Sequence, residues 1–147
     1  MKISKVALSI LNTKDYNTFF KIFKNEKMEY LHCDVMDGNF VPNINLMDSD
    51  YKKLVKNSPF KNDVHIMVSD PIKIVKKFAH YKANIITAHL EAFKTEKEIL
   101  EFFNELIRRK IKIGLSIKPK TSFEKIKPYL EYCYKKYKTE KLEKLYD

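Results

Sequence analysis

Short apolar runs alternate along the chain with longer segments in which apolar residues recur at every third or fourth position. The apolar runs cover residues 5–11, 29–36, 62–68, 83–90 and 111–117. Runs of this length that are apolar at nearly every position are typical of strands covered on both faces. The segments that follow them have the period of amphipathic helices. Five strand–helix units in succession predict an α/β fold with a parallel sheet and right-handed crossovers.

Capping signals indicate where two of the helices begin. Ser69 or Asp70 stands just before Pro71, and proline is favoured in the first turn of a helix. Thr121 and Glu124 have the spacing of a capping box, which predicts the start of the fifth helix.

The end of the chain departs from this alternation. After Leu130 a sixth strand is expected, but residues 131–147 are polar, charged and helix-like. We therefore expect residues 1–130 to hold the five strand–helix units and residues 131–147 to form a polar helical tail.

Ionisable side chains occupy alternate positions inside the apolar runs. His32, Asp34 and Met36 share one face of the second strand, and Asp63, His65 and Met67 repeat the pattern in the third. The first strand contributes Ser9 near its end, and the fourth closes with His89 and Glu91. If these strands are parallel neighbours, Ser9, His32, Asp34 and His65 gather at the carboxyl edge of the sheet, where sites form in α/β folds.

Two interpretations of this cluster stay open on spacing alone. Two imidazoles and a carboxylate, from His32, His65 and Asp34, could ligate a divalent metal ion. Alternatively, they are core histidines paired with a carboxylate, because buried titratable groups usually occur paired. His89 and Glu91 are either structural or orient the ligands.

The net charge of +10 raises the question of nucleic-acid binding. The lysines are spread along the whole chain, however, and only Arg108 and Arg109 offer the forked guanidinium group favoured in base and phosphate recognition. Nucleic acid is therefore the weaker interpretation, since an anionic small substrate would be served equally well. No apolar run approaches the roughly 18 residues of a membrane span, and no leader pattern stands at the start, so we expect a cytoplasmic protein with no membrane partner.

Five segments, in order from about residue 6 to residue 130, resemble the ribulose-phosphate 3-epimerase family. "LHCDVMDGNFVPN" (31–43) is similar to the family signature His-x-Asp-x-Met-Asp-Gly-x-Phe-Val-Pro-Asn, and "DVHIMVSDP" (63–71) to its Asp-x-His-(Leu/Met)-Met-Val-x-x-Pro segment. "ALSIL" (7–11), "TAHLEA" (87–92) and "GLSIKPKTSFEKIKPYL" (114–130) resemble three further blocks, with Ala7 in place of the family's proline.

The resemblance implies a fold and an activity. The family fold is a TIM-type (β/α)₈ barrel, and the five units would be its first five. The family interconverts D-ribulose 5-phosphate and D-xylulose 5-phosphate, a reaction of the pentose phosphate pathway, by metal-assisted proton transfer at C3. A sugar phosphate is thus the implied partner and one divalent metal ion, Zn, Fe, Mn or Co, the implied cofactor.

By position, the resemblance also implies residue roles. His32, Asp34 and His65 would be metal ligands, and Asp34 would also accept the C3 proton. Ser9 and His65 would contact the substrate, and Met36 and Met67 would form an apolar wall beside the reacting carbon. These roles would explain why a buried strand carries His32 and Asp34.

Some parts that the resemblance implies are not found in these 147 residues. The family has a second Asp, which acts on the opposite face of the sugar, and Gly-rich phosphate loops, whereas the glycines here are Gly38 and Gly114. We therefore expect a C-terminally truncated member: a partial barrel with an open sheet edge and an apolar inner face. It would stand alone, form a homo-oligomer or pair with a complementary second-half chain. Either it is an epimerase, or it is an inactive remnant that serves as a metal-binding, ligand-binding or assembly fragment.

Overall fold

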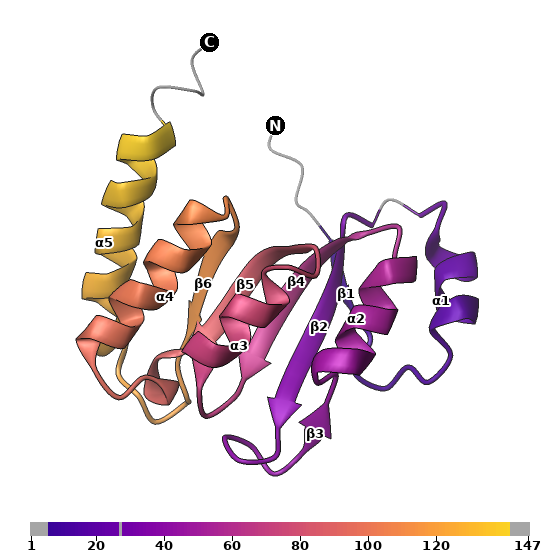
Figure 1. Cartoon of the computed structure of the whole chain (residues 1–147), viewed down its shortest axis with the longest axis horizontal. Coiled ribbons are helices and arrows are strands. Elements are labelled where there is room, and N and C mark those ends of the chain that lie inside the picture. The colour runs from indigo at the N-terminus through magenta and orange to yellow at the C-terminus, as the bar shows by residue number, and fades with distance from the viewer. Residues whose placement is uncertain (1–5, 27, 142–147) are drawn as a thin grey trace.

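The computed structural model of the protein describes residues 6–26 and 28–141. Its central sheet has five parallel strands in the order β1 (Ala7–Ser9), β2 (Tyr30–Asp37), β4 (Lys61–Met67), β5 (Ala83–His89) and β6 (Lys112–Ser116). A two-residue strand, β3 (Ile44–Asn45), pairs antiparallel with the end of β2. The five predicted apolar runs are all strands, and in Figure 1 the colours cross the sheet in chain order.

Helices connect the strands: α1 (Tyr16–Phe23), α2 (Asp48–Asn57), α3 (Pro71–Phe78), α4 (Glu96–Arg108) and α5 (Phe123–Lys141), with a 3-10 turn η1 (Leu90–Ala92) after β5. Successive long strands pair in parallel, so each of the first four helices belongs to a crossover that carries the chain back to the starting edge of the sheet. This alternation is an α/β fold consistent with a partial TIM barrel, as the sequence predicted.

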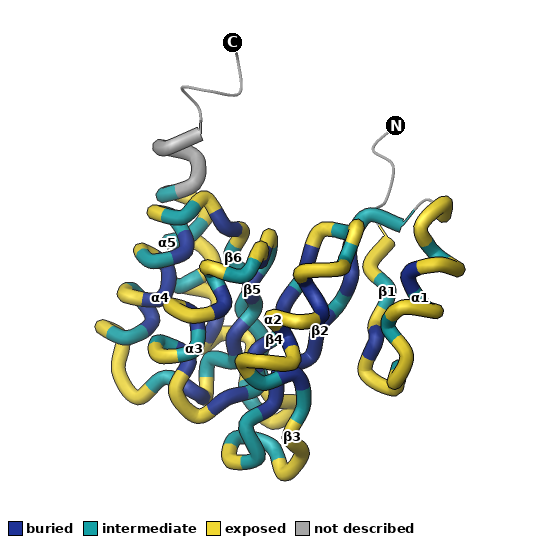
Figure 2. The backbone as a smooth tube through the Cα atoms, turned by 45° about the vertical axis from the view of Figure 1, so that its right-hand side comes forward, coloured by how far each residue is buried: buried dark blue, intermediate teal, exposed yellow. Residues whose placement is uncertain are grey.

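The core lies between the sheet and its helices. Alternate residues of the central strands are fully buried on that side, among them Leu31, Cys33, Val35, Val64, Ile66 and Ile86. The helices contribute large side chains such as Tyr51, Phe78, Phe102 and Phe103. Figure 2 shows buried residues concentrated in the strands, with exposed ones on the turns and outer helix surfaces. Because alternate residues share a face, this packing fixes which side chains of each strand point the other way.

The opposite face of the sheet is mainly polar, with apolar side chains such as Met36 and Met67 among the polar ones. It carries half-buried or buried polar side chains, namely His32, Asp34, Asp63, His65, Thr87, His89 and Ser116. The expectation of an apolar inner face therefore holds only for part of it. The helix-facing residues of these strands supply most of their buried apolar surface, so the positions on the other face can carry ionisable side chains.

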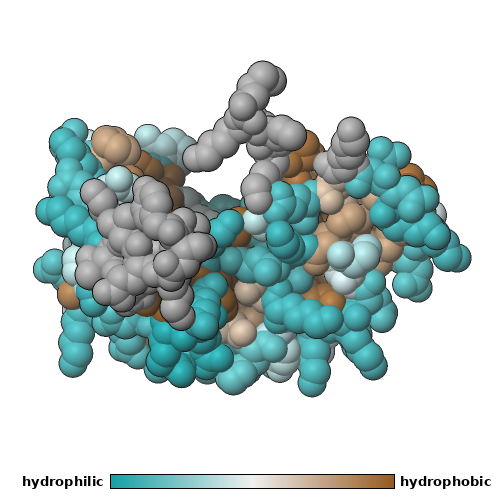
Figure 3. All heavy atoms as spheres, turned by 90° about the horizontal axis from the view of Figure 1, so that it is seen from above, coloured by the Kyte–Doolittle hydropathy of each residue, from teal (hydrophilic) through white to brown (hydrophobic). Residues whose placement is uncertain are grey.

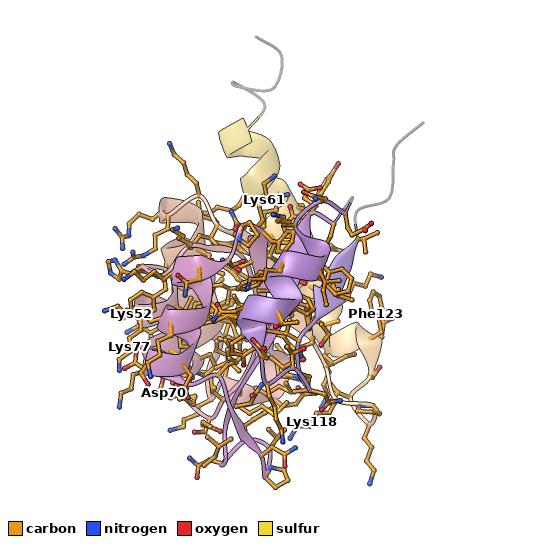
Figure 4. The ribbon with its side chains drawn as sticks, turned by 90° about the vertical axis from the view of Figure 1, so that its right-hand side faces the viewer. Lys52, Lys61, Asp70, Lys77, Lys118 and Phe123 are labelled. Atoms are coloured by element: carbon orange, nitrogen blue, oxygen red, sulfur yellow. The ribbon has the colours of Figure 1, made fainter. Side chains whose placement is uncertain are left out.

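The carboxyl ends of the strands lie at one edge of the molecule. In Figure 4, Lys61 at the start of β4 lies at the opposite end from Lys118, which follows β6. Asp70, which follows β4, lies toward the same end as Lys118. Residues near the ends of β1, β2, β4, β5 and β6 are thereby brought to a common edge.

Of the two predicted capping patterns, the one at Asp70 forms and the one at Thr121 does not. Asp70 is the N-cap of α3, and its carboxylate accepts a hydrogen bond from the Lys73 amide at 3.0 Å. The capping box predicted at Thr121 does not form: the Thr121 hydroxyl donates to Glu91, and the Ser122 hydroxyl accepts from the Glu124 amide at 3.3 Å. The Thr121 hydroxyl bonds to Glu91, a residue far away in sequence, and no local pattern predicts this pair.

Helix α5 crosses residue 130 without a break, and residues 142–147 of the predicted polar tail lie outside the described residues. The face shown in Figure 3 is largely hydrophilic, with hydrophobic side chains in separate patches. Within the described part of the chain, no helix combines the length and hydropathy needed to cross a membrane.

Candidate active site at the carboxyl edge of the sheet

The register of two neighbouring strands brings the predicted site residues together. In the parallel pair β2 and β4, Asp34 stands opposite His65, and Met36 opposite Met67. On the other side of β2, Ser9 of β1 stands opposite His32. The residues are 20 or more positions apart in sequence, yet the ladder hydrogen bonds fix them side by side on one face.

One carboxylate oxygen forms the centre of the cluster. Asp34 Oδ1 lies 3.3 Å from His32 Nε2 and 3.2 Å from His65 Nδ1. The Asp34 side chain is 12% exposed, while those of His32 and His65 are 29% and 21% exposed. The three groups are thus withdrawn from bulk water but can still be reached from the open face.

These interactions set the ionisation of the cluster. Hydrogen bonds from His32 and His65 hold the pKa of Asp34 well below its ordinary value. Hydrogen bonds to Asp34 and Asp63 raise the pKa of His32 to about 10, although burial opposes the shift. Asp34 is therefore an ionised carboxylate at neutral pH, the form that can ligate a cation or accept a proton.

The same three residues fit a divalent metal ion. Their ligand atoms all lie within 4.8 Å of one another. An ion with bonds of about 2.0–2.2 Å needs ligand atoms no farther apart than about 4.4 Å, so at most a small side-chain adjustment closes the cluster around it. Two imidazole nitrogens and a carboxylate oxygen suit Zn, Fe, Mn or Co and do not select among them.

A second layer of polar groups surrounds the histidines. Asp63 Oδ2 lies 2.8 Å from His32 Nδ1, and His89 Nε2 lies 2.9 Å from His65 Nε2. The Ser116 hydroxyl is 3.4 Å from the same His65 nitrogen. Burial, and then the charge of His65, lower the pKa of His89. The strand pattern in the sequence places Asp63 on this face without a role, and it does not single out Ser116. The register of the parallel strands is the signal that finds both.

The remaining predicted residues line the same region to different degrees. Met36 is 7% exposed and Met67 is half-buried beside it, two residues further along the strands than Asp34 and His65. Ser9 is exposed at the end of β1, where its hydroxyl accepts a hydrogen bond from the Leu11 amide at 3.4 Å. The structure thus gathers the two methionines at the cluster and leaves Ser9 at its margin.

The Asp-Gly turn after β2 is a structural feature. Gly38 has φ +77°, and the Asp37 carboxylate accepts hydrogen bonds from the Asn39 and Phe40 amides, each at 2.9 Å. The Ser69 amide and hydroxyl bind its other oxygen at 2.8 and 2.7 Å. Asp37 therefore ties the loop after β2 to the loop after β4, at the rim of the cluster.

The sequence of the chain is similar to those of known proteins. A sequence profile of the ribulose-phosphate 3 epimerase family matches residues 5–135. The chain belongs to this family. The match confirms the resemblance drawn from the motifs around His32 and His65.

Curated ribulose-phosphate 3-epimerases are among the relatives. The chain is 32% identical to that of Helicobacter pylori over 127 residues, which are 86% of this chain and 57% of the relative. It is 35% identical to that of Aquifex aeolicus over 105 residues, 71% of this chain and 46% of the relative. For Eremothecium gossypii the identity is 36% over 121 residues, 73% of this chain and 49% of the relative. The chain spans about half the length of the curated relatives it matches.

Proposed function

We propose that this chain carries the proton-abstracting half of a ribulose-phosphate 3-epimerase site, which acts at C3 of D-ribulose 5-phosphate and D-xylulose 5-phosphate. The observation that supports this most directly is the cluster of His32, Asp34 and His65, with all ligand atoms within 4.8 Å. Membership of the family supplies the reaction class, and the cluster supplies groups that the reaction needs.

Asp34 is the proposed proton acceptor. Its pKa is held low by His32 and His65, so it is ionised at neutral pH but is a weak base. Such a base removes a proton from C3 only if that proton is made more acidic. A divalent ion held by His32, Asp34 and His65 would, when bound, supply this by polarising the ketone and hydroxyl oxygens as a Lewis acid.

Other side chains bind and shield the substrate in this proposal. His65 and Ser9 lie on either side of β2 and would contact the sugar oxygens. Met36 and Met67 would exclude water beside C3, because their thioether side chains form a nonpolar and adaptable surface. A sugar phosphate is thus the proposed small-molecule partner.

The test is proton exchange at C3. Purified chain, with added Mn²⁺ or Zn²⁺ and D-ribulose 5-phosphate in deuterated water, should exchange the C3 proton at a rate that NMR can follow. Asp34→Asn should abolish this exchange, because the amide has no basic oxygen to accept the proton. Asp50→Asn, at an exposed position of α2, is the matched control and should leave the rate unchanged.

Two results would contradict this proposal. If the folded wild-type chain binds the metal ion but exchanges no proton, the chain is a metal-binding fragment of the family rather than an epimerase. Exchange that persists in Asp34→Asn would instead assign the proton transfer to another group.

A further inference from the structure

His65 makes contacts of different kinds through its two ring nitrogens. Nδ1 faces the Asp34 carboxylate at 3.2 Å, and Nε2 faces another ring nitrogen, Nε2 of His89, at 2.9 Å. The two rings are stacked, with centroids 4.9 Å apart and planes inclined by 28°. On the far side of His89, its Nδ1 lies 3.6 Å from Glu91 Oε2. His65, His89 and Glu91 therefore form a row that leads away from the candidate metal site.

The contact between two ring nitrogens restricts where protons can lie. At 2.9 Å one nitrogen must donate and the other accept. If His65 offers the lone pair of Nδ1 to an ion, its proton is on Nε2, so His89 Nε2 is the acceptor. A neutral His89 then carries its own proton on Nδ1. That nitrogen is buried and has no hydrogen-bond partner within the described residues, so the carboxylate of Glu91 at 3.6 Å is the group placed to attract the proton.

We propose that His89 is a positioning residue that keeps the lone pair of His65 Nδ1 directed at the metal ion, and that Glu91 fixes the tautomer of His89. This inference rests on the proposed function, because it requires a metal ion at His65. It also makes the two histidine ligands unlike each other. His32 has Asp63 at Nδ1, 2.8 Å away, and so presents Nε2 to Asp34, whereas His65 presents Nδ1.

Glu91 is itself held firmly by the loop that follows β6. One of its carboxylate oxygens, Oε1, accepts the Lys118 amide at 2.7 Å and the Thr121 hydroxyl. The other oxygen, Oε2, remains directed toward His89. This anchoring gives Thr121 a function outside the capping box predicted from sequence, because it joins the loop between β6 and α5 to the row of His65, His89 and Glu91.

The Phe40 ring packs against His89, and the Lys118 side chain in turn lies over Phe40. The Phe40 ring lies 5.1 Å from the His89 ring, and Lys118 Nζ lies 4.1 Å from the Phe40 centroid. Figure 4 shows Lys118 at the end of the molecule where the strands terminate. Shielding from water strengthens the weak attraction between His89 Nδ1 and Glu91, since electrostatic interactions grow as the local dielectric falls.

Tautomers in the Zn²⁺-loaded chain test the proposal directly. The protein has four histidines, so long-range ¹H–¹⁵N NMR spectra can be assigned with single substitutions. We expect protons on Nδ1 of His32, Nε2 of His65 and Nδ1 of His89. A proton on Nδ1 of His65, or on Nε2 of His89, would overturn the inference.

Metal affinity gives a second test, with Co²⁺ as the probe. His89→Phe keeps the ring packing but removes the acceptor, and we expect it to weaken Co²⁺ binding by about 10–100-fold, the usual effect of losing a group that orients a ligand. His89→Gln should recover most of the affinity, because its amide oxygen can accept from His65. The controls are the same substitutions at His80, an exposed histidine beside Arg109.

The Co²⁺ affinities of these variants decide between the role of His89 as an acceptor and a role in packing alone. Equal Co²⁺ affinity in the wild type and His89→Phe overturns the inference and leaves the metal site intact. A loss of affinity in His89→Gln as large as that in His89→Phe also overturns it, since packing and not hydrogen bonding would then be responsible. A wild-type chain that does not bind Co²⁺ overturns the metal site and this inference together. Binding without C3 exchange contradicts only the proposed activity.

Discussion

His32 Nδ1 lies 2.8 Å from Asp63 Oδ2, across the paired strands β2 and β4. The second nitrogen of the same ring faces Asp34. Asp63 therefore holds the His32 ring with Nε2 turned toward the candidate metal site. Histidine ligands commonly depend on a carboxylate in this place for their orientation and basicity.

Asp63→Asn and Asp63→Ala should weaken binding of a divalent ion. We expect a loss of about 10–100-fold in affinity, larger for Ala because Asn retains one acceptor oxygen. Titration of Co²⁺ or Zn²⁺ by calorimetry measures the change, and Asp50→Asn is the matched control. Unchanged affinity in Asp63→Ala would show that His32 needs no such support.

Gly114→Ala should destabilise the fold through one defined contact. A Cβ at this position of β6 would lie 2.0 Å from Thr87 Oγ1 and 2.8 Å from Thr87 Cβ on the neighbouring strand. Glycine in a strand often marks such a close approach. We expect the free energy of unfolding to fall by about 1–3 kcal/mol, as measured by urea denaturation.

The same contact predicts partial rescue. Thr87→Ala removes the hydroxyl that causes the 2.0 Å approach but leaves the Cβ contact. The double variant Gly114→Ala, Thr87→Ala should therefore be more stable than the sum of the two single changes predicts. Strict additivity would contradict the assignment of the strain to this pair.

Asp37 should contribute stability that is lost in acid. Burial tends to raise its pKa, but hydrogen bonds from Ser69, Phe40 and Asn39 outweigh burial and lower it from 3.8 to about 2. A lowered pKa in the folded state means that the contribution is complete above the unfolded pKa. It disappears as the pH falls from about 4 to about 2.

Asp37→Asn should consequently be less stable than the wild type at pH 6, because the amide nitrogen cannot accept hydrogen bonds, and the difference should shrink by pH 2. Denaturant titrations at several pH values measure this. Ser69→Ala, which removes the hydroxyl bond of 2.7 Å and keeps the amide bond, should show a smaller effect. A difference that stayed constant over this pH range would mean that the charge of Asp37 is not stabilising.

Tyr51→Phe should stabilise the protein. Tyr51 is fully buried beside Phe78, and among the described residues its hydroxyl has no hydrogen-bond partner. An unsatisfied buried polar group costs about 1–3 kcal/mol, so its removal should raise the free energy of unfolding by an amount near the lower end of that range. Tyr134→Phe, at a side chain 69% exposed, is the control and should have no measurable effect. A destabilised Tyr51→Phe would reveal a partner for the hydroxyl.

The sequence alone determined the order of the five parallel strands and the helices that follow them, but not the short strand β3 or the turn η1. Apolar runs such as 62–68, followed by segments of helical period, specify βα units. A strand buried on both faces is apolar at nearly every position, whereas a helix buried along one stripe is apolar at every third or fourth position. The spacing of two between His32 and Asp34, and between Asp63 and His65, also determined that each pair shares one face of its strand. The carboxyl edge as the place of the site followed from the parallel topology.

The tertiary structure decided which of these groups meet. Asp63 pairs with His32, and His89 with His65, only because β2, β4 and β5 align in one particular register. The Thr121 hydroxyl likewise bonds to Glu91, 30 residues away, instead of capping its own helix, because the packing of the loops brings Glu91 within reach. Local periodicity carries no information about such pairs. They depend on the packing of the whole sheet against its helices, which sets the register and with it the direction of each hydrogen bond.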